Sequence, residues 1–209
     1  MARVTEVDVV ALHRAHLKPL RGVLARAFHD DPLPTFVSPS ERRRPAVIRS
    51  FLAPIARDAI PFGHAYAAVD ADGVHGVAAW LPPGAYPPSV ARQVRQMPGL
   101  VRIVSLVPRR LSFLFRSLGE LVRLHPKEEH WYLALLAVDP SRQGQGVGRK
   151  LIEPVLARAD AEGLPAYLET TKSANVSWYR GAGFELVDEV SVGDGPPIWT
   201  MRREPRSSR

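Results

Sequence analysis

Residues 130–152 read HWYLALLAVDPSRQGQGVGRKLI and contain, in order, an apolar run, a glycine-rich turn and the start of an amphipathic segment. The nearly all-apolar run 130–138 is typical of a strand buried inside a sheet. Three glycines at positions 144, 146 and 148 follow it. We therefore expect a strand, a loop and a helix over 147–162, a layout that places backbone N–H groups and a helix N-terminus around a phosphate.

The spacing of these glycines excludes two common phosphate-binding loops. Walker A requires G-x-x-x-x-G-K-[ST], and the dinucleotide pattern requires G-x-G-x-x-G. Counted from Gly144, the sixth position of both patterns is Arg149, and counted from Gly146 it is Leu151. The pattern that remains is Q-x-x-G-x-G over residues 143–148. It suits a pyrophosphate held by backbone N–H groups without a metal ion.

Basic residues in and after the loop are expected to add positive charge at its rim: Arg142, Arg149 and Lys150. A tight strand-to-helix turn that binds nothing is the alternative reading of these few residues.

A second motif follows about thirty residues later, in NVSWYRGAGFELV over 175–187. The Q-x-x-G-x-G loop, the VDP that ends the strand before it, and N-x-x-x-Y-x-x-x-G-F at Asn175, Tyr179, Gly183 and Phe184 together resemble the GNAT superfamily of N-acetyltransferases. The close similarity covers about residues 131–187. The two motifs in this order and at this distance are much more specific than either one alone.

The resemblance implies a fold, a cosubstrate and an activity. The fold is α+β (α/β mixed), with a central, mostly antiparallel twisted sheet of about six to seven strands, flanked by helices. The cosubstrate is acetyl-CoA, and the activity is direct transfer of its acetyl group to an amine in a ternary complex. A catalytically silent CoA-binding regulatory module is the alternative. The resemblance places the cosubstrate on Leu136, Ala137, Val138, Gln143, Gly144, Gln145, Gly146, Val147, Gly148 and Asn175.

Two residues are the candidates for acid–base catalysis. Tyr179 matches the position from which many family members protonate the departing thiolate, and a phenol keeps its proton at neutral pH. Several family members carry a glutamate base near the position of Tyr132, so this sequence departs from the family there. We expect Glu169 to serve as the general base instead, because a carboxylate in the otherwise apolar segment AYLETT needs a partner or a function. Glu128, Glu129 and His130 are the other substitutes.

The composition bounds the class of protein. The chain has 209 residues, 45% of them hydrophobic, and no cysteine, which excludes disulfides, thiolate metal sites and an acetyl-cysteine intermediate. We expect no metal, no membrane span and a cytoplasmic protein. The abundance of Arg, Ala and Pro hints at a GC-rich bacterial source. A net charge of +7 raises the possibility of nucleic-acid binding, but no helix-turn-helix, RNP or zinc pattern accompanies it.

We expect one domain over 1–203 and a disordered basic tail over 204–209. The expected elements are a strand at 3–8, one or two helices over 9–29 interrupted at Pro19, a loop at 30–40, a helix from Ser40 to about Ile60 and a hairpin at 63–81. Strands are also expected at 165–171, 184–192 and 197–203, and a short helix at 175–183.

Residues 85–128 form an expected helical insertion, broken at Pro98–Gly99 and at Pro108. It is apolar with interspersed arginines, and we interpret it as a lid over the acceptor site. A homodimer surface and a membrane-surface helix are the alternatives. Asp30 and Asp31 could meet a cationic amine, although aspartates beside a proline also make turns.

Overall fold

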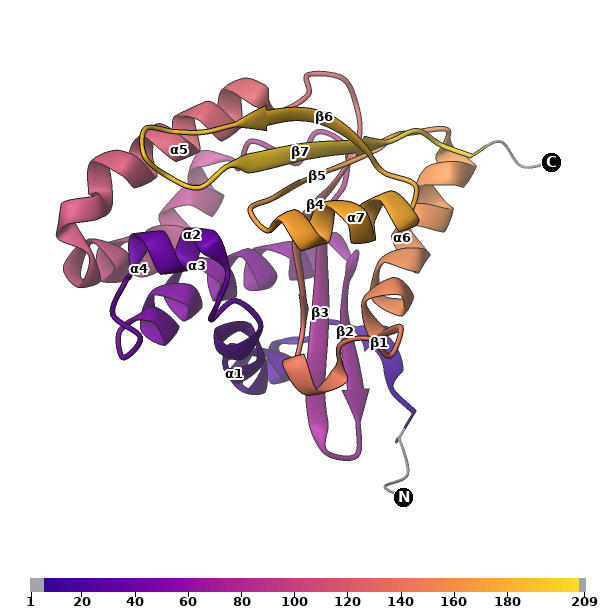
Figure 1. Cartoon of the computed structure of the whole chain (residues 1–209). Helices are drawn as coiled ribbons and strands as arrows, with labels where there is room; N and C mark the ends of the chain where they lie inside the picture. The colour runs from indigo at the N-terminus through magenta and orange to yellow at the C-terminus, as the bar shows by residue number, and fades with distance from the viewer. Residues whose placement is uncertain (1–5, 207–209) are drawn as a thin grey trace.

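The computed structural model describes residues 6–206, and a single seven-stranded sheet runs through it (Figure 1). The strand order is β1-β2-β3-β4-β5-β7-β6, and every neighbouring pair is antiparallel except β4–β5. The strands are β1 Asp8–Ala11, β2 Ala65–Asp70, β3 Gly73–Leu81, β4 Trp131–Val138, β5 Ala166–Thr170, β6 Glu185–Val190 and β7 Ile198–Arg203. The predicted mixed, mostly antiparallel sheet is confirmed.

The two edges of β4 are paired very differently. On one side, the ladder with β3 runs from Gly76↔Val138 to Leu81↔Tyr132, with one irregularity beside Ala79. On the other side, β5 pairs with β4 only at Trp131↔Ala166 and Tyr132↔Tyr167. Beyond these two pairs the strands separate, and β5, β7 and β6 fan away from the first four strands (Figure 1). We call this gap the β4–β5 opening.

Helices cover both faces of the sheet. Helices α6 (Val147–Glu162) and α7 (Ser173–Gly181) pack on one face and share a core with Trp131 and Leu133 of β4. Helices α1 (Leu17–Ala27) and α3 (Arg44–Ala59) pack on the other face, over Leu135 and Ala137. Simple alternation would place these four odd-numbered residues of β4 on one face. The register irregularity between Leu133 and Leu135 shifts the alternation, so β4 contributes side chains to both cores.

The insertion consists of α4 (Val90–Leu106) and α5 (Leu111–Leu124). The expected break at Pro98–Gly99 is wrong, since α4 runs through both residues and only the predicted break at Pro108 occurs, as a 3-10 turn over Pro108–Arg110. A Cβ on Gly99 would lie 2.5 Å from the Ser50 carbonyl oxygen of α3, so glycine lets the two helices approach closely.

A third core cluster joins the insertion to the rest of the fold. Phe113 of α5 and Ile103 of α4 are buried with Val47 of α3 and with Val192, in the loop between β6 and β7. The insertion is therefore packed along one end of the sheet.

Three expectations near the N-terminus are wrong. The first strand lies at 8–11 rather than 3–8, and residues 1–5 lie outside the described part of the chain. Pro19 does not interrupt α1 but sits in its first turn, where no backbone N–H donor is needed. The expected loop at 30–40 contains a short helix, α2 (Pro32–Val37), because the Asp31 side chain accepts a hydrogen bond from the Leu33 N–H and caps it.

The remaining elements follow the prediction closely. The hairpin closes at Asp70↔Gly73, and α6 has the predicted bounds and ends at Gly163, which has a left-handed backbone conformation. Short 3-10 turns lie at Arg14–His16, Ile60–Phe62 and Pro140–Arg142. Of the expected tail over 204–209, residues 207–209 lie outside the described chain. Among the described helices, none has the length and apolar character needed to cross a bilayer.

Candidate active site

The glycine loop joins the end of β4 to the N-terminus of α6. The side chain of Asp139 accepts hydrogen bonds from the N–H and hydroxyl of Ser141, which fixes the first turn of the loop. Gly144 and Gly146 have φ angles of +74° and +78°, a left-handed conformation that other residues adopt only with strain. No atom lies within 4 Å of a Cβ placed on either glycine, so their backbone faces open space. The loop therefore presents N–H groups beside the positive end of a 16-residue helix.

The two glutamines of the motif hold the loop's shape. Gln143 Nε2 donates to the Val138 carbonyl over 3.1 Å, and Gln145 Nε2 donates to the Ser141 carbonyl over 3.0 Å. A Cβ on Gly148 would meet the Trp178 ring at 3.1 Å, so this glycine lets α6 pack closely on α7.

The three basic residues expected at the rim are engaged elsewhere. Arg142 Nη2 pairs with the buried carboxylate of Asp70 at 2.5 Å. Arg149 donates to the Gly181 carbonyl, and Lys150 Nζ lies 3.4 Å from the Glu6 carboxylate. These contacts satisfy the three side chains, so backbone groups are the main source of positive potential in the loop.

The three residues predicted to make main-chain contacts lie on the open edge of β4. Leu136, Ala137 and Val138 all pair with β3 and lie beyond the two positions at which β5 pairs with β4. Leu136 and Val138 pack toward the core under α6, whereas Ala137 belongs to the core under α1 and α3. Peptide groups on this edge can therefore meet an extended ligand in the way they would meet another strand.

Helix α7 places Asn175 and Tyr179 beside the opening. Asn175 Nδ2 donates to the Thr170 hydroxyl over 3.1 Å, which ties the first turn of α7 to the end of β5. Tyr179 is 7% exposed and packs edge-on against Phe184, with ring centroids 5.7 Å apart. Burial raises the pKa of the Tyr179 phenol well above its ordinary value, so the hydroxyl keeps its proton at neutral pH.

Glu169 lies on the opposite face of β5, in a pocket of aromatic residues. Its side chain is 11% exposed and faces three tyrosines, Tyr86, Tyr132 and Tyr167. Burial, followed by the negative charge of Glu169, raises the pKa of each of these phenols, so all three remain protonated. Tyr132, near the position at which several GNAT members carry a glutamate, thus faces Glu169 on the neighbouring strand.

His125 lies directly beside this carboxylate. Its Nδ1 is 3.6 Å from Glu169 Oε1, and the imidazole is 6% exposed. The ring stacks on Tyr86 with centroids 4.0 Å apart. Within the described residues, this Nδ1 is a buried atom without a hydrogen-bond partner.

A second imidazole fixes the protonation of the first. His130 Nδ1 lies 2.7 Å from the Glu128 carbonyl oxygen, which can only accept, so this nitrogen carries a proton. Burial lowers the pKa of His130 and favours the neutral ring, whose Nε2 then accepts from His125 Nε2 over 3.0 Å. With its Nε2 engaged in this way, His125 turns its Nδ1 toward Glu169. Glu169 and His125 together can therefore take up a proton.

Other candidates for the site have structural roles. Glu128 is exposed and pairs with Arg202. Glu129 is also exposed. Asp31 is 6% exposed and accepts from the Thr171 hydroxyl over 2.7 Å, besides capping α2. Asp30 is exposed on the surface beside His29. Asp31 thus makes a turn, as the simpler of the two interpretations predicted.

Tyr86 and His125 are missing from the prediction. Both belong to the insertion or its entrance and are more than forty residues from Glu169 in sequence. The signal that could have found His125 is a polar residue directly after the apolar face of α5, where the chain turns back toward β4.

Comparisons with known proteins agree with this geometry. A model of the acetyltransferase (GNAT) family matches residues 105–184, which contain β4, the glycine loop, α6, β5 and α7. Residues 105–184 are thus similar to GNAT acetyltransferases. The chain is also 36% identical over 88 residues to an uncharacterized N-acetyltransferase of Schizosaccharomyces pombe. That match covers 40% of this chain and 36% of the yeast protein, so it spans little more than a third of the relative.

Solved structures extend the likeness over the whole GNAT fold. A crystal structure described as histone acetyltransferase HPA2 and related acetyltransferase from Corynebacterium glutamicum has a TM-score of 0.67 and 26% identity, covering 97% of this chain and 98% of that chain. Arylalkylamine N-acetyltransferase 2 from Aedes aegypti has a TM-score of 0.59 at 14% identity, covering 96% and 99%. At such an identity the second likeness shows the fold alone.

Proposed function

We propose that this protein is an acetyl-CoA-dependent N-acetyltransferase that transfers the acetyl group directly to an amine. The observation that carries the proposal is the β4–β5 opening, with the glycine loop directly after β4. The buried phenol of Tyr179 and the Glu169–His125 pair, which lie on opposite faces of the sheet, support it.

The residues at the opening fit acetyl-CoA. The N–H groups of the loop, from Gly144 to Gly148, would hold the pyrophosphate at the start of α6. The free edge of β4, at Leu136, Ala137 and Val138, would pair with the pantetheine arm. Asn175 would face this arm from α7. When bound, acetyl-CoA supplies an activated acetyl thioester.

The side chains divide the proton transfers between the two faces. Glu169 accepts a proton from the attacking amine nitrogen, and His125 shares it through Nδ1. Tyr179 donates its phenolic proton to the leaving sulfur, which becomes a thiol. Backbone N–H groups of β4 stabilise negative charge on the carbonyl oxygen. With no cysteine in the chain, direct transfer between the two bound substrates is the route.

A catalytically silent CoA-binding module is the second candidate. It would need the loop and β4 but no base. The burial of Glu169 and His125 favours the enzyme over the silent module. Removing two ionisable groups from water costs free energy, and a module that only binds CoA gains nothing from it.

The test is an acceptor screen. Release of free CoA would be measured with acetyl-CoA and polyamines, amino acids, aminoglycosides, lysine-containing peptides and free peptide N-termini, while calorimetry measures CoA binding. We expect both binding and amine-dependent release. Binding without release from any amine would favour the silent module, and absence of binding would overturn both.

A further inference from the structure

A second cavity lies away from the β4–β5 opening, between α1, α3 and α4. It encloses about 460 Å³ and is lined by Leu17, Arg21, Arg49, Ser50, Ala53, Pro54, Arg57, Arg95, Pro98, Gly99 and Arg102. We call it the arginine pocket. None of these residues belongs to β4, β5, the glycine loop or α7, so the pocket shares no residue with the groups proposed for cosubstrate binding and proton transfer.

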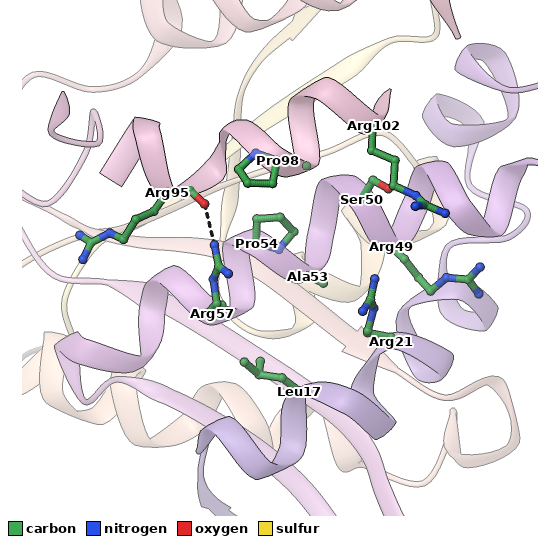
Figure 2. Close-up of a pocket in the computed structure, with 11 residues that line it drawn as sticks. Leu17, Arg21, Arg49, Ser50, Ala53, Pro54, Arg57, Arg95, Pro98 and Arg102 are labelled. Atoms are coloured by element: carbon green, nitrogen blue, oxygen red, sulfur yellow. Dashed lines mark hydrogen bonds between the residues drawn. The ribbon is translucent and has the colours of Figure 1, made fainter. Parts of the chain in front are cut away.

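The lining has positive charge and no compensating negative charge. Five of the residues are arginines and none is acidic. Figure 2 shows the guanidinium groups of Arg21, Arg49 and Arg102 on the same side of the pocket, while Arg57 reaches across to α4 and donates to the Arg95 carbonyl over 2.6 Å. The side chain of Arg95 points away from the others (Figure 2).

Two well-buried arginines elsewhere in the fold pair with carboxylates. Arg92, also on α4, pairs with Asp58 at 2.6 Å, and Arg203 pairs with Asp160 at 2.7 Å. Among the described residues, no lining arginine of the pocket takes part in an ion pair of this kind. Like charges gathered around one pocket repel one another, and an anion between them would reduce the repulsion.

We propose that the arginine pocket binds a small organic anion with more than one negative charge on its phosphate groups. Guanidinium groups form paired hydrogen bonds to phosphate oxygens, and three of them on one side match a multiply charged group. Leu17, Ala53 and the Pro54 and Pro98 rings supply an apolar wall for the body of the ligand. The site is independent of the acetyl-transfer chemistry.

The phosphate could belong to a free metabolite or to a lipid headgroup. Helix α4 presents exposed apolar side chains on the side opposite its packed face: Val90, Val94, Met97, Val101 and Val104. The pocket is recessed between three helices, which favours the free anion, and a vesicle experiment separates the two sources.

The experiment uses inorganic pyrophosphate as the probe, titrated by calorimetry into the full chain with saturating CoA so that the glycine loop is occupied. We expect binding that weakens with salt and that falls at least 10-fold in the double variant Arg49→Gln/Arg102→Gln. Arg109→Gln/Arg116→Gln is the control, because it removes the same charge from exposed arginines outside the pocket.

Ala53→Phe is a second variant that fills the pocket without changing the charge, and it too should abolish binding. No binding to the wild type, or equal loss in the pocket and control variants, would overturn the proposal. Vesicles of phosphatidylglycerol and of phosphatidylcholine form the other arm. The wild type could sediment with phosphatidylglycerol vesicles, while the Arg49→Gln/Arg102→Gln variant does not and pyrophosphate does not bind. That result would overturn the assignment to a free anion and indicate a lipid headgroup as the ligand.

Discussion

The two faces of the β4–β5 opening are built in different ways. On the face of α6 and α7, the glycine loop, Asn175 and Tyr179 come from one continuous stretch of about forty residues. On the face of α1, α3 and the insertion, Glu169 meets side chains from Tyr86, His125 and Tyr132, which the fold collects from distant segments. The first face would bind the cosubstrate and protonate the leaving group. The second would remove the proton from the acceptor.

The largest effect is expected from the second face. Glu169→Gln keeps the shape of the side chain but cannot accept a proton, so kcat should fall about 10²–10⁴-fold. Affinity for acetyl-CoA, measured by calorimetry, should stay within about 2-fold. Glu153→Gln, on an exposed position of α6, is the matched control and should leave kcat unchanged. Equal kcat in the two variants would place the base elsewhere.

The first face should contribute a smaller rate effect. Tyr179→Phe removes a hydroxyl whose raised pKa keeps it protonated, and kcat should fall about 10²-fold with little change in CoA affinity. Steady-state release of free CoA measures both. Tyr66→Phe removes a hydroxyl from a residue packed on the same core cluster but on β2. If both variants lose activity alike, Tyr179 is a packing residue.

The loop can be tested by comparing the two ends of α6. Gly146→Ala and Gly163→Ala each place a Cβ at a left-handed φ, of +78° and +67°, and each should cost about 1–2 kcal/mol of stability. Only Gly146→Ala should also weaken acetyl-CoA binding, by about 10-fold, because Gly146 belongs to the loop whose backbone N–H groups would face the ligand. Thermal unfolding and calorimetry separate the two effects. An equal loss of affinity at Gly163 would mean that the loop acts only through stability.

His125 tests whether the second face works as a unit. His125→Gln keeps a polar side chain but cannot carry the shared proton, so kcat should fall about 10-fold. The shape of the pH–rate profile should also change, because the proton-accepting pair then lacks one of its two members. A purely structural role would lower activity equally at every pH, and that result would contradict the proton-sharing pair.

The smallest effect on activity is expected outside both faces. The two hydrogen bonds from Arg203 lower the pKa of Asp160, so the pair stabilises the fold above the ordinary pKa of the carboxyl, near 3.8, and the contribution is lost as the pH falls through the lower, folded value. Asp160→Asn should therefore destabilise the protein by about 2 kcal/mol at pH 7. Denaturant unfolding should show this difference shrinking below pH 4, with kcat unchanged. A constant difference at all pH values would mean that packing, not charge, is responsible.

The sequence predicted the strand and the helix of the first face well because their signals are local. The glycine spacing, the apolar strand and the Tyr179 motif each depend on a few neighbouring residues, and α6 has the predicted bounds. The second face could not be predicted from local patterns, because its residues come together only in the folded chain. Glu169 was conspicuous as a carboxylate in an apolar strand, but no local pattern connects it to His125 or Tyr86. The same limit applies to Pro98, where packing of Gly99 on α3 overrides the usual helix-breaking tendency.

The position of His125 at the end of α5 has a consequence for how such enzymes diversify. In the proposed enzyme, segment 85–128 would both shape the acceptor side and supply His125 of the proton-accepting pair, so substrate choice and reactivity would be inherited together. A chimera that receives a foreign 85–128 segment would exchange both properties in one step. Restoring both His125 and the neighbouring Tyr86 in such a chimera is then the smallest change expected to recover acetyl transfer.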